Sequence, residues 1–570
     1  MFRTFTLKLA FSVVCAISLL HIHSLEVTAA ETLELSSQTQ VLEDGKVHEQ
    51  SGRWIEAINL YEQGLKKWPE DSDIKYHLRV SKIHFGIERR YEDDSFENDL
   101  LRQLRGEALS LYESVFSRVQ GYYVDRLSPT SFVAHGTESL YYALGNPKFV
   151  HRNLPQASPE QIRMLKNKLY EEFWNKPVRD QYSARTMVER VCDLSQQHVG
   201  MSYGPVVMEF LFGGCNALDD YSNFLTPDRL EDLYGNIEGE FVGLGIEMKA
   251  QLGKGMHLVD VLPGSPAEDG GLRPREFIVG IDGADCRNMS TDEAARLLRG
   301  PENSRVRLDI YNPLHDETRQ REFVRRPVEV LSIPIARMVD KENGTAYIKM
   351  AGFQKGTAQE MDAALARLSN EGMRSLIWDL RDNPGGLLTA AVEVLDRFIG
   401  QGVIVETRGR SSDQNWVYRA HHNSQHRTYE TLPIVLLVNG NSASASEIVA
   451  GAMRDHNRAQ IIGRKTYGKW SVQSIYPIGG IPGGGDSKTG LRITTARFYS
   501  PNGHTYSKIG IEPNIEVDEL PVIAENGGDG SVGEEIVSTF YRGDFDHSYK
   551  SDPDIQRGMQ ELREQLSLRR

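Results

Sequence analysis

The sequence predicts an α/β protein of several domains, in which a layered region of alternating strands and helices follows a helical N-terminal region and a small strand-rich domain. Three observations predict this class. The chain has 570 residues, too many for one hydrophobic core at roughly 150 residues per domain. From Gly239 short strands and tight turns replace helical spacing. Beyond Pro327 strands alternate with helices, as in βα layers.

The composition excludes several classes of protein. Hydrophobic residues make up 39% of the chain, charged residues 25%, and the mean hydropathy is -0.43. These values argue against a polytopic membrane protein and against wholesale disorder. The 65 Lys and Arg against 79 Asp and Glu give a formal charge of -14, the wrong sign for a surface that binds nucleic acid.

The cysteines and histidines do not predict a metal site or a disulfide framework. The cysteines are Cys15, Cys192, Cys215 and Cys286. They are too scattered for zinc spacing, and without Cys15 an odd number remains, so we expect at least one free thiol. His421 and His422 with His426 have no carboxylate at helical spacing, which favours a polar loop. We expect no metal and no organic cofactor.

Residues 1–30 predict an export signal. Arg3 and Lys8 give a positive start, Leu9–Leu20 is apolar, and small residues precede Ala30. A retained anchor is the alternative, but this apolar run is shorter than the ~20 residues that span a bilayer. We therefore expect an exported protein, periplasmic or extracellular, with no membrane span after cleavage.

Two helical regions precede the strand-rich part. Residues 31–115 contain Gly52, Trp54, Ala57 and Tyr61 at spacings that resemble one tetratricopeptide repeat, and a plain helical hairpin is the alternative. This helical extension suggests a docking surface for a protein adaptor. Residues 116–238 form a second helical region, in which Thr226-Pro227 predicts a helix start.

Residues 239–328 hold an ordered set of short strands, turns and one helix that resembles a PDZ domain. Gly243-Leu244-Gly245-Ile246 stands at the position of the carboxylate-binding loop. Successive backbone N–H groups in such a turn can hold a terminal carboxylate, and the adjacent strand edge can pair with the peptide. We expect Gly243, Leu244, Gly245 and Ile246 to bind polypeptide C-termini, whereas the glycine-containing loop by itself also fits a simple bend.

Within residues 329–520, the buried strand Ile434–Val438 is followed by a turn of small residues around Ser444 and then by a helix. Such a turn can expose a nucleophilic serine beside backbone N–H groups at the helix start. The alternative is local: Ser444 and Glu447 also fit a capping box, which is a structural role.

Two further segments could complete a catalytic site. Lys469 could act as a base for a serine if desolvation lowers its pKa, although a lone loop lysine is usually a solvated surface residue. The N–H groups of Gly385 and Gly386 could meet that of Ala445 around an oxyanion, or the glycine pair could be a tight turn that opens a helix.

Several long motifs in order resemble those of the C-terminal processing peptidases, or tail-specific proteases. They are the segments 379–386, 437–439 with 442–448, 465–469 with 471–473, and 510–515. The resemblance covers residues 116–520 and implies a layered fold similar to crotonase-like and Clp-type enzymes with an inserted PDZ domain. It implies Ser444 as nucleophile, Lys469 as general base and Gln473 as the residue that orients Lys469. Asp455 matches an acidic position that we interpret as structural.

The expected function is an exported serine endopeptidase that captures apolar C-termini and cleaves nearby. The main departure from the family pattern is Trp470, where the family usually has Gly directly after the base. The rival is therefore a catalytically inactive scaffold of PDZ domain and helical repeat. Acyl-CoA chemistry on a related fold lacks a CoA-binding feature. Residues 521–570 are expected to be a C-terminal tail, a linker followed by a charged helix.

Overall fold

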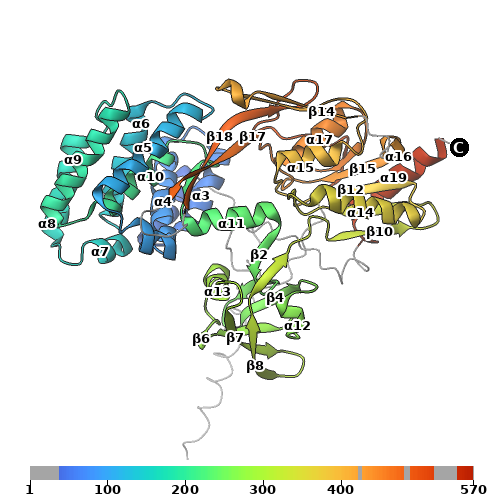
Figure 1. Cartoon of the computed structure of the whole chain (residues 1–570), viewed down its shortest axis with the longest axis horizontal. Coiled ribbons are helices and arrows are strands. Elements are labelled where there is room, and N and C mark those ends of the chain that lie inside the picture. The colour runs from blue at the N-terminus through green and yellow to red at the C-terminus, as the bar shows by residue number, and fades with distance from the viewer. Residues whose placement is uncertain (1–36, 422–426, 481–487, 519–548, 569–570) are drawn as a thin grey trace, which may run out of the picture. The chain divides into compact units, whose positions relative to one another are not determined.

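A computed structural model describes residues 37–421, 427–480, 488–518 and 549–568. The predicted export signal, His422, His426 and the glycine-rich start of the tail lie outside these residues. The chain divides into two compact units, Met1–Phe85 and Gly86–Arg570, which are described separately (Figure 1).

The first unit consists of helices that pack closely through small residues. They are α2 (Gln38–Gln50), α3 (Trp54–Lys67) and most of α4 (Ser72–Arg90). A Cβ added to Gly45 would lie 2.3 Å from the Tyr61 ring, so only glycine permits this approach of α2 to α3. Ala57 and Tyr61 are fully buried at this contact. The contacts fit the predicted helix pair, and the tetratricopeptide repeat stays a prediction.

The second unit begins with a bundle of helices. Its main helices are α5 (Arg105–Tyr122), α6 (Pro129–Ala143), α7 (Pro147–Asn153), α8 (Pro159–Lys168), α9 (Gln181–Val199), α10 (Tyr203–Cys215) and α11 (Pro227–Glu238). Helix α10 is almost entirely buried and contacts α6 at glycines. Helix α11 begins at Pro227, and the Thr226 hydroxyl accepts a hydrogen bond from the Arg229 N–H, which confirms the predicted helix start.

The predicted PDZ region is a separate small sheet with two helices. Its sheet has the order β3-β4-β5-β7-β8, with β6 paired to β5. The elements are β3 (Ile246–Gln251), β4 (Gly255–Val261), α12 (Pro266–Asp269), β5 (Phe277–Ile281), β6 (Ala284–Asp285), α13 (Thr291–Leu298), β7 (Arg305–Asn312) and β8 (Glu317–Val324). The strands β2 (Glu240–Gly243) and β9 (Arg326–Glu329) pair antiparallel, so the chain enters and leaves this domain through one ribbon.

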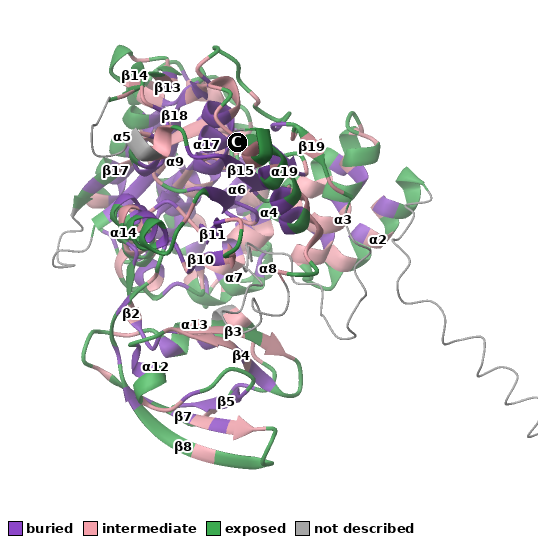
Figure 2. Cartoon of the chain, turned by 90° about the vertical axis from the view of Figure 1, so that its right-hand side faces the viewer, coloured by how far each residue is buried: buried purple, intermediate pink, exposed green. Residues whose placement is uncertain are grey.

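The layered region is built on a six-stranded sheet of order β10-β11-β12-β15-β16-β19. Its strands are β10 (Ile335–Asp340), β11 (Thr345–Lys349), β12 (Ser375–Asp379), β15 (Ile434–Val438), β16 (Gln460–Gly463) and β19 (Ile515–Glu516). All neighbouring strands are parallel except β10, which is antiparallel to β11. The strands β11, β12 and β15 are buried along their whole length, as Figure 2 shows for β11 and β15.

Helices cover both faces of this sheet. Helices α14 (Thr357–Asn370), α15 (Leu388–Leu395) and α17 (Ala445–Asp455) share one hydrophobic core with one set of strand residues. Helix α19 (Pro553–Leu568) shares a second core with the alternate strand residues, including Tyr347, Ile377 and Val435. The predicted charged helix of the C-terminal tail is thus present, and it packs on the sheet.

A second sheet lies beside the first and includes a strand from the helical region. It runs β1 (Asn223–Leu225), β18 (Lys488–Tyr499), β13 (Gly402–Gly409) and β14 (Trp416–Ala420), and β17 (Ser471–Gly480) pairs with β18. The pairing of β1 with β18 attaches the segment before α11 to the layered region. The loop that follows β16 enters β17, so the segment that carries Lys469 connects the two sheets.

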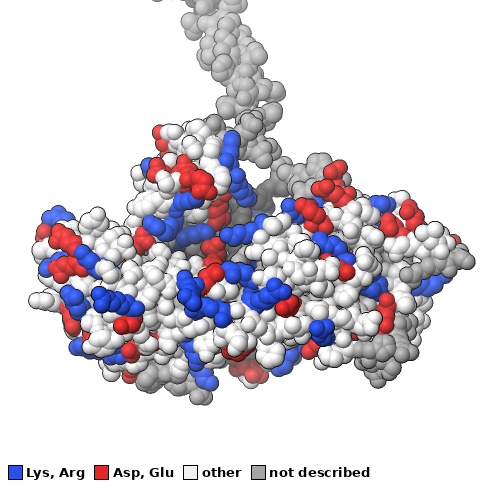
Figure 3. Space-filling view, turned by 90° about the horizontal axis from the view of Figure 1, so that it is seen from above, with Lys and Arg blue, Asp and Glu red and all other residues white. Residues whose placement is uncertain are grey.

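The described cysteines agree with the expectation of at least one free thiol. The thiols of Cys192, Cys215 and Cys286 are free and buried, and burial raises the pKa of Cys215 to about 12. In the described part of the chain, no helix has the length and apolarity that crossing a membrane requires, and no three His, Cys, Asp or Glu side chains group as metal ligands. On the face shown in Figure 3, acidic and basic side chains are intermingled.

Gly136 provides a test of the contact between α6 and α10. A Cβ at this position would lie 2.6 Å from Cδ1 and 2.8 Å from Cα of Phe210. Gly136→Ala should therefore destabilise the helical region by about 1–3 kcal/mol through overpacking, seen as a lower unfolding temperature in calorimetry.

Gly121→Ala is the matched control, because Gly121 is an exposed residue of α5 with no atom within 4 Å of an added Cβ. It should leave the unfolding temperature unchanged or raise it slightly. Equal unfolding temperatures for the two variants would contradict the close contact.

Candidate active site

Three serines follow β15, and the structure distinguishes the middle one. The Ser442 hydroxyl donates to the Leu380 carbonyl at 2.8 Å, and the Ser446 hydroxyl donates to the Asn383 carbonyl at 2.9 Å. Ser444 is half-buried, with φ 55° and ψ -112°, a conformation that side chains rarely adopt. Such strain between a strand and a helix is typical of an exposed nucleophile. Ser442 and Ser446 therefore hold the turn, and Ser444 stands at its apex.

The capping-box alternative is only half correct. The Glu447 carboxylate does accept a hydrogen bond from the Ser444 backbone N–H at 2.9 Å. The Ser444 side chain, however, makes no hydrogen bond to the helix cap. Its hydroxyl is therefore not committed to starting α17.

The glycine turn after β12 lies directly against this serine. A Cβ added to Gly385 would lie 2.8 Å from the Ala445 nitrogen and 2.8 Å from Cβ of Ser444. The Gly385 N–H donates to Oδ1 of Asn383 at 2.8 Å. Among the described residues, no acceptor is found for the N–H groups of Gly386 and Ala445. These two groups are therefore available to an added acceptor, and Gly385 permits the close approach of the two turns.

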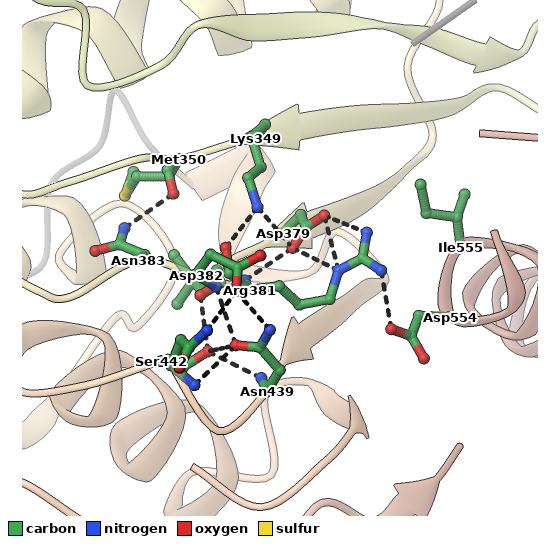
Figure 4. Close-up of polar contacts among 12 residues, drawn as sticks. Lys349, Met350, Asp379, Arg381, Asp382, Asn383, Asn439, Ser442, Asp554 and Ile555 are labelled. Atoms are coloured by element: carbon green, nitrogen blue, oxygen red, sulfur yellow. Dashed lines mark hydrogen bonds and ion pairs between the residues drawn. The ribbon is translucent and has the colours of Figure 1, made fainter. Parts of the chain in front are cut away.

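Polar contacts fix the shape of this turn (Figure 4). The Asn383 amide donates to the Met350 carbonyl at 2.9 Å, and the Ala443 N–H donates to the Asn383 carbonyl at 3.1 Å. Asp382 has φ 60°, and its N–H donates to Oδ1 of Asn439 at 3.0 Å. The turn after β12 is thus joined to the turn after β15, as expected where parallel strands end at one edge of a sheet.

Lys469 is half-buried and lies beside an aromatic ring. Its Nζ stands 4.5 Å from the centroid of the Tyr221 ring, which belongs to the segment before β1. Burial, together with a hydrogen bond to the exposed Tyr467, raises the pKa of Tyr221 well above its usual value, so the ring is neutral. A cation over such a ring is stabilised by the quadrupole of the ring.

Glu447 connects the serine turn to the lysine loop. This fully buried carboxylate accepts hydrogen bonds from the backbone N–H groups of Ser444 (2.9 Å), Gly468 (2.7 Å) and Lys469 (2.8 Å) and from the Thr466 hydroxyl (2.7 Å). Burial raises the pKa of Glu447, and the four hydrogen bonds oppose this shift. The capping pattern pointed to Glu447, but no local signal predicted its partners in the lysine loop.

Gln473 is hydrogen-bonded to two hydroxyl groups, whereas Trp470 is buried among aromatic rings. The Gln473 amide donates to the hydroxyls of Ser471 (2.9 Å) and Thr494 (3.0 Å), and its role in orienting Lys469 stays a prediction. The Trp470 ring is 1% exposed and packs on Phe498 at a centroid distance of 4.5 Å. Trp470 therefore belongs to the hydrophobic core, so its presence after Lys469 is a packing feature.

Asp455, the acidic residue further along α17, has a structural contact. Its carboxylate accepts a hydrogen bond from the Asn502 N–H at 3.0 Å, in the turn after β18. The contact agrees with the interpretation of Asp455 as a support of the fold.

The loop predicted to bind carboxylates has a conformation that requires glycine. Gly245 has φ 75°, and an added Cβ would lie 2.3 Å from Cβ of Ser265. The Leu244 carbonyl accepts from the Ala267 N–H at 2.9 Å, and the Gly245 carbonyl accepts from the Leu262 N–H at 2.9 Å. Two backbone hydrogen bonds thus hold the loop that starts at Gly243. The loop leads into β3, which begins at Ile246, and α13 packs on β3.

Comparisons with known proteins match the two regions that carry these sites. Residues 344–517 match the model of Peptidase family S41, and residues 257–312 match that of the PDZ domain. The carboxy-terminal-processing protease of Bartonella bacilliformis is 34% identical over 331 residues, which are 57% of this chain and 73% of that protein. The carboxyl-terminal-processing protease of Synechocystis sp. is 34% identical over 309 residues, 54% of this chain and 69% of that protein.

Among solved structures, the chain is similar to one titled photosystem II D1 C-terminal processing protease. The sequence identity is 25% and the TM-score is 0.38, with 72% of this chain and 93% of that chain covered.

Glu447→Gln tests the connection between the two loops. The amide has nearly the same shape, but its NH2 group cannot accept the N–H donors that one carboxylate oxygen binds. A misplacement of either loop should slow the reaction of Ser444 with a fluorophosphonate probe by about 10²-fold, as followed by mass spectrometry.

Glu360→Gln is the matched control. Glu360 also accepts two backbone N–H groups, those of Ser332 (3.0 Å) and Ile333 (2.9 Å), on a different segment. This variant should react at the rate of the unmodified protein. The same rate for Glu447→Gln would show that Glu447 does not position the serine.

Proposed function

Since the chain belongs to peptidase family S41 and is a carboxy-terminal-processing serine protease by family, we propose that Ser444 and Lys469 form its catalytic dyad. The observation that supports this most is the common carboxylate of Glu447, which holds the N–H groups of both residues at one point. The substrates proposed are exported polypeptides with apolar C-termini. No metal or organic cofactor is part of the proposal.

The reaction begins with Ser444, which stands at the start of α17 with a strained backbone and a side chain that does not cap the helix. The Ser444 hydroxyl attacks the carbonyl carbon of the scissile peptide bond while its proton passes to the Lys469 amine. The protonated amine then gives this proton to the leaving nitrogen, and water hydrolyses the acyl-enzyme in a second, similar cycle. The family's Ser-Lys pair thus replaces the serine and histidine of other serine proteases.

Lys469 can accept a proton only as a neutral amine. Its present contact with the Tyr221 ring favours the ammonium form, because the ring attracts a cation. Proton transfer from Ser444 requires a neutral amine within hydrogen-bond reach of the hydroxyl, where desolvation lowers the pKa of the amine. In this proposal Gln473 orients Lys469 for that transfer.

The oxyanion of the tetrahedral intermediate is held by backbone N–H groups. Those of Gly386 and Ala445 are the proposed donors, and Gly385 allows the two segments to meet. The Ala445 N–H is also at the start of α17, where the helix dipole favours negative charge. One such donor contributes about 3 kcal/mol to transition-state stabilisation in enzymes where it has been removed.

The PDZ domain supplies the choice of substrate. A C-terminal carboxylate is proposed to bind the Gly243-Leu244-Gly245-Ile246 loop, with the peptide added as a strand along β3. A tail held in this way stays at high effective concentration near the protease region, so a weak tail affinity is sufficient. Export to the periplasm or cell exterior and an adaptor on the N-terminal helices complete the proposal. The scaffold alternative loses its main support, because Trp470 is a core residue.

Ser444→Ala and Lys469→Ala test the dyad. Each should reduce cleavage of an unfolded reporter protein with an apolar C-terminus by at least ~10³-fold, because nucleophile and base act as one unit. Cleavage is followed by gel electrophoresis, and binding of a fluorescent C-terminal peptide is the control that should stay unchanged. Cleavage at the original rate by both variants would refute the assignment.

Gly245→Val tests the PDZ loop. The added side chain would collide with Ser265 and strain a residue with φ 75°, and so distort the carboxylate-binding turn. Tail binding and cleavage of the tailed reporter should fall by about tenfold or more, whereas hydrolysis of a short peptide should stay within about twofold. Equal losses in both assays would count against substrate capture by this loop.

A further inference from the structure

We propose that the C-terminal helix α19 positions the two loops of the active site, with Asp554 as the positioning residue. The inference rests on the proposed dyad and deepens it. The match to the family model ends at residue 517, so α19 lies outside the region that the comparison covers. A role for α19 in the reaction therefore rests on the contacts that α19 makes in this chain.

Helix α19 is docked closely on the sheet. Its residues Ile555, Met559 and Leu562 are buried in the core that lies on the sheet face opposite α17. A Cβ added to Gly558 would lie 3.3 Å from Cγ1 of Val435, so the helix backbone approaches β15 closely. The helix packs on β12, β15 and β16, the strands whose ends carry the site.

At the start of α19, one carboxylate bridges two arginines. Asp554 is 1% exposed at its side chain and accepts hydrogen bonds from Nη1 of Arg381 (2.9 Å) and Nη1 of Arg464 (2.7 Å). Figure 4 shows Asp554 beside Ile555 on the α19 side and the guanidinium of Arg381 pointing toward it. Asp552 adds a second carboxylate to Arg381 at 2.9 Å.

The two arginines stand where the two active-site loops begin. Arg381 is the second residue after β12, and the turn that follows it leads to Gly386. Arg464 comes directly after β16, its N–H donates to the Val438 carbonyl at 3.0 Å, and the next residues lead to Lys469. Asp554 thus joins the oxyanion turn to the lysine loop at their origins.

The Arg381 side of this bridge is itself held firmly. Asp379 is fully buried and accepts from Arg381 (2.6 Å) and from the Tyr347 hydroxyl (2.7 Å). The Lys349 ammonium donates to the Arg381 carbonyl at 2.5 Å. Burial by itself would raise the pKa of Asp379, but the charges of Arg381 and Lys349 hold it well below its usual range. Asp379 is therefore ionised, and charge-assisted hydrogen bonds restrict the geometry of its contact with Arg381.

Two carboxylates consequently hold the loops from opposite sides of the sheet. Glu447 acts from α17 on the loop backbones beside Ser444, and Asp554 acts from α19 on the strand ends. A small shift of a reacting group costs a large factor in rate, so loss of either support should lower the rate of the chemical step.

Asp554→Asn in the full chain tests the proposal. The amide keeps the shape but loses the charge that holds Arg381 and Arg464. With a short peptide substrate, well below the unfolding temperature, kcat should fall by about tenfold or more while KM stays within about twofold. Fluorophosphonate labelling of Ser444 should slow by a similar factor.

Arg563→Gln is the matched control on the same helix. Arg563 pairs with Asp340 at 2.9 Å, at the β10 end of the sheet, so its loss weakens docking of α19 without touching the strand ends that carry the site. Its kcat should stay within about twofold of the original. An unchanged kcat for Asp554→Asn, or equal losses for the two variants, would overturn the proposal.

Arg464→Gln decides the question if Asp554→Asn does not fold. Arg464 is 23% exposed at its side chain, so its replacement disturbs the protein interior less than a change at Asp554. Arg381 remains present as a partner of Asp554. A lower kcat with unchanged KM supports the bridge, and an original kcat overturns it. Ser444→Ala separates the two proposals. If Ser444→Ala is active, the proposed dyad is wrong. If Ser444→Ala is inactive and Asp554→Asn has the original kcat, only the role of α19 is wrong.

Discussion

The active site depends on one buried interaction, the contact of the Glu447 carboxylate with N–H groups of two segments that are remote in sequence. It holds the backbone of Ser444 on one side and that of Lys469 on the other. A buried carboxylate is costly unless it is fully hydrogen-bonded, and here four donors surround it. The same donors that stabilise the carboxylate therefore fix the relative position of the turn that carries Ser444 and the loop that carries Lys469.

The parallel sheet brings these segments together. Strands β12, β15 and β16 are neighbours, so the turns after them meet at one edge, which carries Ser444, Lys469 and the proposed oxyanion donors. Glycine at 385 and a strained serine at 444 permit an approach that other residues would block. Helix α19 then connects two of these strand ends from the other face through Asp554. The order of the strands in the sheet thus determines both how the layers pack and which segments meet at the proposed site.

The sequence predicted what depends on local pattern and missed what depends on contacts between distant segments. The buried run of β15, the turn at Ser444 and the glycine pair are readable from neighbouring residues. The partners of Glu447 in the lysine loop, the burial of Trp470 and the docking of α19 are not, because each requires the tertiary fold. The spacing of serine and lysine also could not show that Lys469 contacts Tyr221.

The most direct measurement is the distance from Ser444 Oγ to Lys469 Nζ in a crystal structure with a peptide bound across the site. The proposed mechanism requires the amine to stand about 3 Å from the hydroxyl, within hydrogen-bond reach. An amine that stays far from the hydroxyl while the scissile carbonyl lies against the Gly386 and Ala445 N–H groups would contradict a Ser-Lys dyad.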